Sequence, residues 1–369
     1  MNWMDLQTLL TALLLLPMLL LPGAVLLTPR LTRPDIFFSI TVEPSLRPSD
    51  AGRAILRQFR YAVLFSTLFG LALTLSGVLA GLTPALAVGL ILGGGAVEFA
   101  GMLTAYKMAR RRVRPYQAEP SREREAVLRP RPARPVGGWL GQAGPFLILG
   151  VAALCIWWRG DAIPQRFAIH GDLHGRADGW AMKSWHSVFG SVLVGTLCCL
   201  FLGLFMNAFA RGVRRVHSSG LDGEKESRFF KTMLWMLLGV EYGMAAMFAG
   251  FSPIMPPGLN IIPLVALSLL GLAAVVVAIR SGQGGWRLRG PSSASTPGHQ
   301  APAGDRTPDE CWKGGLFYYN PADPAVFVEK RFGVGWTFNL GNPRAWFGLG
   351  ATLLFGAAVV WLSMLLMGN

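Results

Sequence analysis

Charge and cysteine are both scarce in this sequence. Of its 369 residues only 15% are charged, whereas 52% are hydrophobic. Soluble globular chains average about 25% charged residues, so the shortage argues against an ordinary water-soluble domain. The four cysteines include no Cys-x-x-Cys pair, which leaves a zinc ribbon or a redox pair without support. A His-Glu-x-x-His motif is lacking too, and with it the signature of a metalloprotease.

The N-terminal apolar run lacks the features of a cleaved signal peptide. Residues 1–5 contain no Lys or Arg, and no Ala-x-Ala site follows the run at 9–27. A secretory signal has a basic start and a small-residue cleavage site. We therefore predict that 1–27 is a retained membrane span.

Long apolar runs are what the sequence has in abundance. A bilayer core of ~30 Å requires roughly 20 helical residues, and buried helices of soluble proteins rarely run so long without a polar face. The sequence therefore predicts an all-α integral membrane protein with about eight transmembrane helices, in which 61–106 and 232–279 form helical hairpins. The eight runs are 9–27, 61–82, 84–106, 139–158, 188–210, 232–250, 261–279 and 345–367.

Basic residues are concentrated in alternate loops. Thirty of the 34 Lys and Arg residues lie in these loops, and the other four lie in the segment 159–187. By the positive-inside rule we predict a multi-pass protein of the bacterial plasma (inner) membrane with both termini extracytoplasmic. The net charge of +14 then faces the anionic lipid bilayer, and no nucleic-acid partner is expected. The basic loops are 28–60, 107–138, 211–231 and 280–344.

The predicted cytoplasmic loops differ in character. Residues 36–42 are rich in β-branched and aromatic residues, which predicts a short strand. Ser49 or Asp50 is positioned to N-cap a juxtamembrane helix that continues through Arg60 into the second span. Two stretches have the composition of solvated linkers, 107–138 and 280–308.

The segment 309–344 is dense in aromatic residues. Residues 312–319 and 326–340 are strand-like, and the sequence at 320–324 predicts the turn that joins them into one cytoplasmic β-hairpin. Packing against the rest of the protein and recognition of a partner or ligand are both open as roles for its side chains. The residues singled out are Trp312, Phe317, Tyr318, Asn320, Phe332, Trp336, Asn339 and Asn342.

The predicted extracytoplasmic segment 159–187 is the most distinctive part of the chain. Glycines recur every fourth residue at Gly171, Gly175 and Gly179, a spacing that favours tight turns. Two imidazoles and a carboxylate within it have the chemistry of zinc ligands, but a hydrogen-bonded surface loop is the better reading, and we predict no metal. The candidate ligand-binding residues are Ile163, Pro164, Phe167, His170, Asp172, His174, Gly175, Asp178, Trp180 and Lys183.

Two stretches resemble bacterial domains of unknown function. The pattern Ile-Pro-x-x-Phe, His, Gly-x-x-Asp-x-Trp at 163–180 resembles a domain that is also found in SdpI-type toxin-immunity proteins. The stretch from Trp312 to Pro343 resembles a second domain that accompanies the first. The resemblance implies a multi-span bacterial membrane protein and, as distant kinship, peptide-toxin resistance or signalling.

Two acidic residues lie inside the apolar runs. Glu98 is eight residues from the end of its run at 106, and Glu241 is nine from the start of its run at 232. At ~1.5 Å per residue their depths agree within a few ångströms. Acids at this depth are costly and commonly functional. They are candidates for a proton or cation site, with a pair of protonated acids joining helices as the alternative.

These observations favour a non-enzymatic membrane protein that senses, or gives immunity to, an extracytoplasmic ligand or peptide. A proton- or cation-coupled transporter that uses Glu98 and Glu241 is the alternative, and a membrane enzyme is the third candidate. No cofactor is expected. The expected partners are the bilayer and either an extracytoplasmic peptide or a cytoplasmic protein.

Overall fold

The computed structural model describes residues 3–80, 82–119, 135–171, 177–214, 220–251, 261–288 and 305–367. Within these ranges lie eight α-helices and four two-stranded β-hairpins. The chain divides into two compact units. Unit 1 consists of Met1–Glu125, Gly282–Asn320 and Glu329–Thr337, and unit 2 consists of Ala126–Ser281, Pro321–Val328 and Phe338–Asn369.

The helices confirm the predicted all-α membrane bundle. Seven of the eight described helices are long and apolar enough to cross a membrane. The eighth, α1, contributes the shorter apolar stretch Leu15–Leu31. Apolar side chains of α7 and α8 point outward, as lipid-facing side chains do and as a water-soluble surface would not tolerate; they include Leu264, Leu269, Leu272, Phe347, Leu353 and Leu354.

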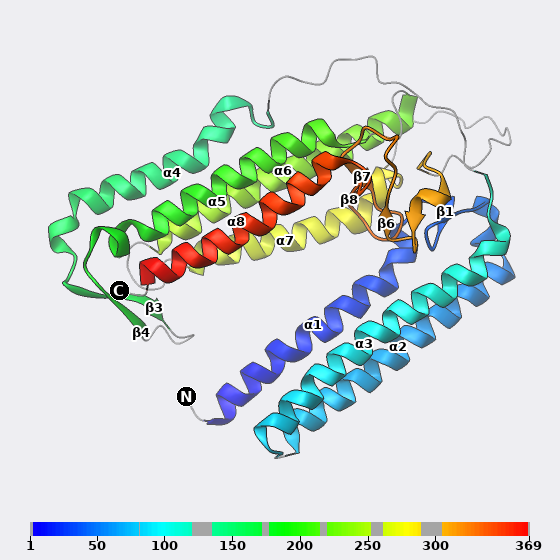
Figure 1. Ribbon diagram of the computed structural model, residues 1–369, viewed down its shortest axis with the longest axis horizontal. Helices are drawn as coiled ribbons and strands as arrows, with labels where there is room; N and C mark the ends of the chain where they lie inside the picture. The colour runs from blue at the N-terminus through cyan, green and yellow to red at the C-terminus, as the bar shows by residue number, and fades with distance from the viewer. Residues whose placement is uncertain are drawn as a thin grey trace. The chain divides into compact units, whose positions relative to one another are not determined.

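Unit 1 is built on three helices that run side by side (Figure 1). These are α1 (Trp3–Leu31), α2 (Asp50–Leu79) and α3 (Pro84–Val113). Of the two N-cap candidates that the sequence offered, it is Ser49 whose side chain caps α2, by accepting from the Gly52 backbone. Small residues let α2 and α3 approach closely: a Cβ built on Gly94 would lie 2.5 Å from the carbonyl oxygen of Gly70.

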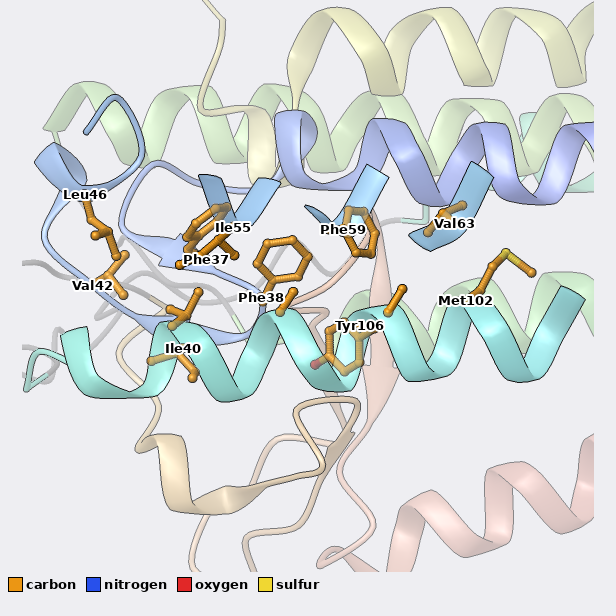
Figure 2. Packing of buried hydrophobic residues seen from close by; sticks show 13 residues of the cluster. Phe37, Phe38, Ile40, Val42, Leu46, Ile55, Phe59, Val63, Met102 and Tyr106 are labelled. Atoms are coloured by element: carbon orange, nitrogen blue, oxygen red, sulfur yellow. The ribbon is translucent and has the colours of Figure 1, made fainter. Parts of the chain in front are cut away.

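A short hairpin connects α1 to α2. Its strands are β1 (Ile36–Phe37) and β2 (Ile40–Thr41), and both residues of the turn have positive φ, 45° at Phe38 and 63° at Ser39. The single strand predicted at 36–42 is therefore folded back on itself. The conformation is costly for a phenylalanine, and packing compensates for it. The Phe38 ring lies 4.8 Å from that of Phe59 on α2 (Figure 2).

Unit 2 contains the other five helices. In chain order they are α4 (Gly138–Trp158), α5 (Trp185–Gly212), α6 (Gly220–Gly250), α7 (Ile261–Ser281) and α8 (Pro343–Met367). The hairpin of β3 (Arg166–Gly171) and β4 (Ala177–Met182) joins α4 to α5. The C-terminal end of α8 lies at the same end of this unit as the hairpin (Figure 1).

Helices α3 and α6 extend well beyond the apolar runs that the sequence predicted as spans. α3 continues seven residues past 106 to Val113, and α6 begins at Gly220 rather than at 232. The apolar run marks the part of a helix that suits the bilayer core, whereas Lys, Arg and Glu are good helix formers. Charged turns therefore extend both helices beyond their apolar runs.

The single hairpin predicted across 312–340 is wrong. The structure has two hairpins there, β5 (Trp312–Lys313) with β6 (Phe317–Tyr318), and β7 (Phe327–Glu329) with β8 (Trp336–Phe338). Glycines explain the difference, because they adopt positive φ without strain. They let each of the two predicted strands, 312–319 and 326–340, fold back as a hairpin of its own. They are Gly314, Gly315, Gly333 and Gly335, with φ of 61°, 79°, 110° and 104°.

Candidate functional site

The 159–187 segment is anchored on the helices of unit 2 through one face of its hairpin. β3 and β4 are antiparallel, with Phe167 opposite Ala181 and Ala168 opposite Trp180. Ile163, Phe167 and Ala181 are buried in one hydrophobic cluster with residues of α4, α5 and α6. Burial of these side chains fixes the hairpin to the helix ends, since apolar contact is the main favourable term in such docking.

The other face of the hairpin is open. Trp180 is 49% exposed, and the Arg166 guanidinium carbon lies 5.1 Å from the centroid of its ring. Pro164 is exposed as well, and the Lys183 backbone donates to the Gln165 carbonyl at 2.7 Å. An exposed tryptophan with a cation over its ring presents an aromatic surface and a positive charge at one place. Such a pair can bind an amphipathic ligand.

The polar residues predicted in this segment are only partly described. His170 and Asp178 lie on β3 and β4, where the structure describes their backbone alone. Asp172, His174 and Gly175 lie outside the described residues, so their predicted ligand chemistry stays a prediction. Elsewhere in the described chain, no group of three or more His, Cys, Asp or Glu side chains is placed to hold a metal ion.

α5 begins directly at the end of this hairpin. The Ser184 side chain accepts from the Ser187 backbone, and the Ser187 hydroxyl contacts the Ser184 backbone in return, which completes a capping box. Ser187 Oγ also donates to the carbonyl of Met182, the last residue of β4, at 2.7 Å. The hairpin and the first turn of α5 are thus one hydrogen-bonded structure.

The far end of α5 is bonded to the C-terminal part of the chain. The Val326 backbone donates to the Gly212 carbonyl at 3.0 Å, and the Arg214 backbone donates to the Phe327 carbonyl at 2.8 Å. Arg214 Nη1 also lies 2.6 Å from Asp323 Oδ2. The Phe327 ring packs 5.1 Å from that of Phe209 on α5. The end of α5 and the segment that begins near Asp323 are therefore held together by hydrogen bonds, an ion pair and ring packing.

That segment is also where the chain resembles other proteins. Residues 321–346 match the model of a family of unknown function, DUF5808. The match falls mostly within the stretch from 312 to 343 that resembled a domain of unknown function. No curated protein and no solved structure matches the chain. The predicted kinship of 159–187 with immunity proteins stays a prediction.

The asparagines of the 321–346 segment hold its turns. Asn339 Nδ2 donates to the Asp323 carbonyl at 3.1 Å, while its Oδ1 accepts from the Gly341 backbone at 3.0 Å. Asn342 Oδ1 accepts from the Arg344 backbone at 3.0 Å, in the first turn of α8. Asn339 and Asn342 therefore hold the segment in a defined shape beside the end of α5.

The aromatic residues predicted in 312–336 divide between packing and exposure. Trp312 and Tyr318 are buried against each other with ring centroids 5.1 Å apart, and the Asn320 side chain donates to the Tyr318 hydroxyl at 3.1 Å. The Phe332 ring lies 4.6 Å from that of Tyr106 on α3. Phe317 is exposed and Trp336 is partly buried. Packing explains most of this set, and Phe317 is its most accessible member.

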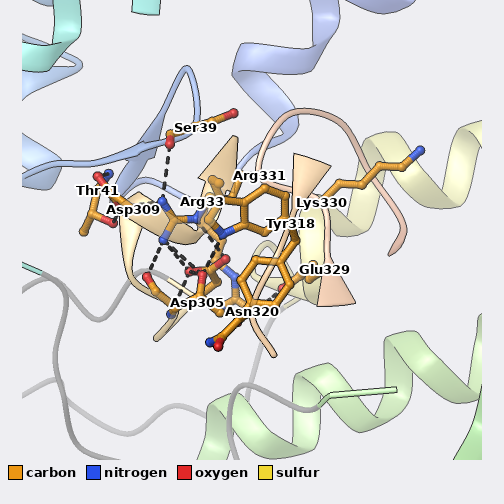
Figure 3. A network of polar contacts seen from close by, with 12 residues as sticks. Arg33, Ser39, Thr41, Asp305, Asp309, Tyr318, Asn320, Glu329, Lys330 and Arg331 are labelled. Carbon is orange, nitrogen blue, oxygen red and sulfur yellow. Dashed lines mark hydrogen bonds and ion pairs between the residues drawn. The ribbon is translucent and has the colours of Figure 1, made fainter. Parts of the chain in front are cut away.

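A buried ionic network in unit 1 was not predicted from the sequence. Arg331 is fully buried, and its Nε and Nη2 lie 3.0 and 2.8 Å from the two carboxylate oxygens of Asp305 (Figure 3). Arg331 also bonds to Asp309, which accepts from the Thr41 hydroxyl at 2.8 Å. Its Nη1 donates to the Ser39 carbonyl at 3.3 Å. One arginine thus fixes the 305–320 region to the β1–β2 hairpin.

The environment of Asp305 makes this network sensitive to acid. Burial alone would raise the pKa of Asp305, but the Arg331 guanidinium and the bonds from Thr307 outweigh it and hold the pKa below the ordinary 3.8. A carboxyl with a lowered folded-state pKa contributes stability that is complete above its unfolded-state pKa and is lost as the pH falls through its folded-state pKa.

We therefore expect the 305–320 region to resist proteolysis at neutral pH and to become cleavable below about pH 4. Limited digestion of the detergent-solubilised protein, with pepsin at acidic pH and trypsin at neutral pH, measures this when each rate is compared with that of an unfolded reference substrate under the same conditions. Asp305→Asn is expected to make cleavage in this region easier at neutral pH and less dependent on pH. Identical pH profiles for the variant and the wild type would contradict the assignment.

Glu98 is buried in unit 1 at the contact between α3 and α2. Its Cβ would lie 3.0 Å from a Cβ built on Gly70, which shows how closely the helices approach at this level. Thr67 on α2 is the polar neighbour of its carboxyl. Among the described residues, neither Glu98 Oε1 nor Thr67 Oγ1 makes a direct hydrogen bond.

Glu241 is buried in unit 2, where α4, α5 and α6 meet. It is 0% exposed, and within the described residues neither carboxylate oxygen has a hydrogen-bond partner. Glu98 and Glu241 thus belong to different units, and their use as a proton or cation site stays a prediction.

Proposed function

We propose that the protein is a non-enzymatic bacterial plasma-membrane protein that senses, or gives resistance to, an extracytoplasmic amphipathic peptide. The β3–β4 hairpin receives the ligand outside, and the 321–346 segment carries the response to the cytoplasmic side. One observation carries the proposal: α5 is hydrogen-bonded to the hairpin at one end and to residues 326–327 at the other. A helix of 28 residues spans about 42 Å, enough to connect both faces of a membrane.

The ligand class follows from the open face of the hairpin. Trp180 offers an aromatic surface and Arg166 a positive charge, so the ligand needs an apolar group beside an acidic or carbonyl group. Exposed tryptophans at such places are typical anchors of binding energy. A short hydrophobic peptide, with its backbone carbonyls and C-terminal carboxylate, has this chemistry.

A deletion strain complemented with variants tests the proposal. Loss of the gene is expected to sensitise cells to a set of peptide antibiotics, and the wild-type gene is expected to restore resistance. Trp180→Ala should weaken peptide binding by about 2 kcal/mol, roughly 30-fold, and should restore little resistance. Trp361→Ala, at an exposed tryptophan of α8, is the matched control and should behave as wild type. Full resistance with Trp180→Ala at normal expression would refute the role of the hairpin.

The relay is tested separately at the other end of α5. Arg214→Asp and Asp323→Arg each place like charges together, and each is expected to abolish resistance while peptide binding is retained. The double variant restores opposite charges and is expected to recover part of the response. If the single variants failed only because they did not fold, combining them would not restore resistance. Recovery in the double variant would therefore show that the contact between residues 214 and 323 itself is required.

Proton- or cation-coupled transport is the second candidate. It is favoured by the burial of Glu98 and Glu241. Among the described residues, Glu98 Oε1 and both carboxylate oxygens of Glu241 have no direct hydrogen-bond partner. A pH-sensitive dye inside proteoliposomes separates the two functions. A carrier produces flux that depends on these acids, whereas a sensor produces none.

A further inference from the structure

Among the residues that the structure describes, none donates a hydrogen bond to the buried carboxyl of Glu241 in unit 2. Its carboxyl faces Gly203 on α5: a Cβ built on Gly203 would lie 3.3 Å from Glu241 Oε1 and 3.6 Å from Gln142 Oε1 of α4. Two oxygen acceptors therefore point toward one place between three helices. An ionised carboxylate without donors costs several kcal/mol in such an environment.

The orientation of Gln142 is fixed by its other atom. Gln142 Nε2 donates to the Val136 carbonyl at 3.1 Å, so a flipped amide would put two acceptors against each other there. The Gly203 carbonyl already accepts from Asn207 Nδ2 at 2.8 Å. A proton on Glu241 removes the charge and makes the carboxyl a donor, for which the amide oxygen of Gln142, on the same side of Gly203, is a candidate acceptor.

No charged side chain is described at this place. The titratable and charged side chains on the three helices packed against α6 are Cys155 on α4, His186, Cys198, Cys199 and Arg211 on α5, and Arg280 on α7. His186 and Arg211 lie at the two ends of α5 and Arg280 at the end of α7. Of these side chains, Cys199 is the one in contact with Glu241: its Sγ lies 3.7 Å from the backbone carbonyl oxygen of Glu241. α7 meets α6 here through leucines, Leu267 and Leu270.

We propose that Glu241 is a proton-binding site that controls how tightly α5 packs on α6. With the proton bound, the carboxyl is neutral and the three helices close over it. When the proton leaves, the carboxylate requires water, and water enters only if α5 moves away at Gly203. Because α5 is the element that joins the hairpin to 321–346, this site regulates the relay; that last step rests on the proposed function.

Infrared spectroscopy of the purified full-length protein in lipid nanodiscs tests proton binding. We expect the C=O stretching band of a protonated carboxylic acid at neutral pH, which decreases as the pH is raised. Glu241→Gln should remove this component, whereas Glu98→Gln should leave it. Gln142→Leu keeps the acid and should shift the band by removing its acceptor, which provides a test even if Glu241→Gln does not fold. A band that neither Glu241→Gln nor Gln142→Leu changes would overturn the proposal.

Alkylation of Cys199 by a small maleimide tests the coupling to helix packing. The alkylation rate of a thiol rises with pH in every variant, because more of the thiol becomes thiolate. The informative quantity is therefore the alkylation rate in the wild type divided by that in Glu241→Gln. We expect this ratio to be near one at about pH 5.5 and about tenfold at about pH 8.5. Cys155 on α4 is the control thiol, and its ratio should stay constant. A Cys199 ratio that does not change with pH would refute the coupling.

These measurements need no peptide. A failed resistance assay with positive spectroscopic and alkylation results would therefore reject the proposed function and leave the proton site standing. The converse result would reject the proton site alone.

Discussion

Replacing Arg331 by methionine is expected to destabilise unit 1 by about 3–5 kcal/mol, because it leaves two buried carboxylates without their cation. Asp305 and Asp309 both bond to Arg331, and the Trp312 ring lies 5.4 Å from its guanidinium carbon. Methionine fills a similar volume but neutralises nothing. The 305–320 region should detach from β1–β2 and become cleavable by trypsin at neutral pH.

The neighbouring Lys330→Met variant is the matched control. It loses the same charge, but its side chain is exposed and is expected to change stability by less than about 0.5 kcal/mol. Thermal unfolding and trypsin digestion of both variants measure the difference. Equal behaviour of the two variants would mean that the buried network contributes nothing beyond net charge.

Adding one methyl group at Gly94 is expected to separate α2 from α3. A Cβ there meets the Gly70 carbonyl oxygen at 2.5 Å and lies closer still to the Thr74 hydroxyl. Backbone atoms cannot yield as side chains do, and overpacking of this kind costs about 1–3 kcal/mol. We expect Gly94→Ala to lower both the yield of folded protein and its melting temperature in detergent.

Gly95→Ala tests the same substitution one residue away. A Cβ at Gly95 meets nothing within 4 Å, so this variant should match the wild type in yield and melting temperature. The pair separates helix contact from any general effect of glycine on helix propensity. A loss of stability in Gly95→Ala as large as that in Gly94→Ala would contradict the packing assigned to this face.

The membrane spans, which the bilayer requires, could be predicted from the sequence. The features that depend on contacts between distant residues could not. Length and apolarity are local properties, so the spans were found, while charged helical turns such as those before Val113 were not. The glycines at 314 and 333 determine the turns of two hairpins, but a turn at 320–324 was equally compatible with the local pattern. From the sequence alone, Arg331 would be taken for a solvent-exposed charge, because its binding partners, such as Ser39, are distant in the sequence.

In the candidate sites, too, local features could be predicted from the sequence and long-range contacts could not. Glu98 and Glu241 were recognisable because acids are rare in apolar runs, and both are buried. The role of α5 was not recognisable. It depends on contacts such as the hydrogen bond between Gly212 and Val326, which are more than a hundred residues apart.

The discontinuity of unit 1 has a consequence for the order of biosynthesis. Ser39 and Arg33 emerge early from the ribosome, but they bond to Arg331 and Glu329, almost three hundred residues later. At about 5–20 residues per second, this delay lasts roughly 15–60 s. During that time α1–α3 have been synthesised, but the polar groups around Ser39 and Arg33 still lack the residues that later bind them, while most of unit 2 is being made. Nascent chains halted before Glu329 should therefore be especially vulnerable to membrane proteases.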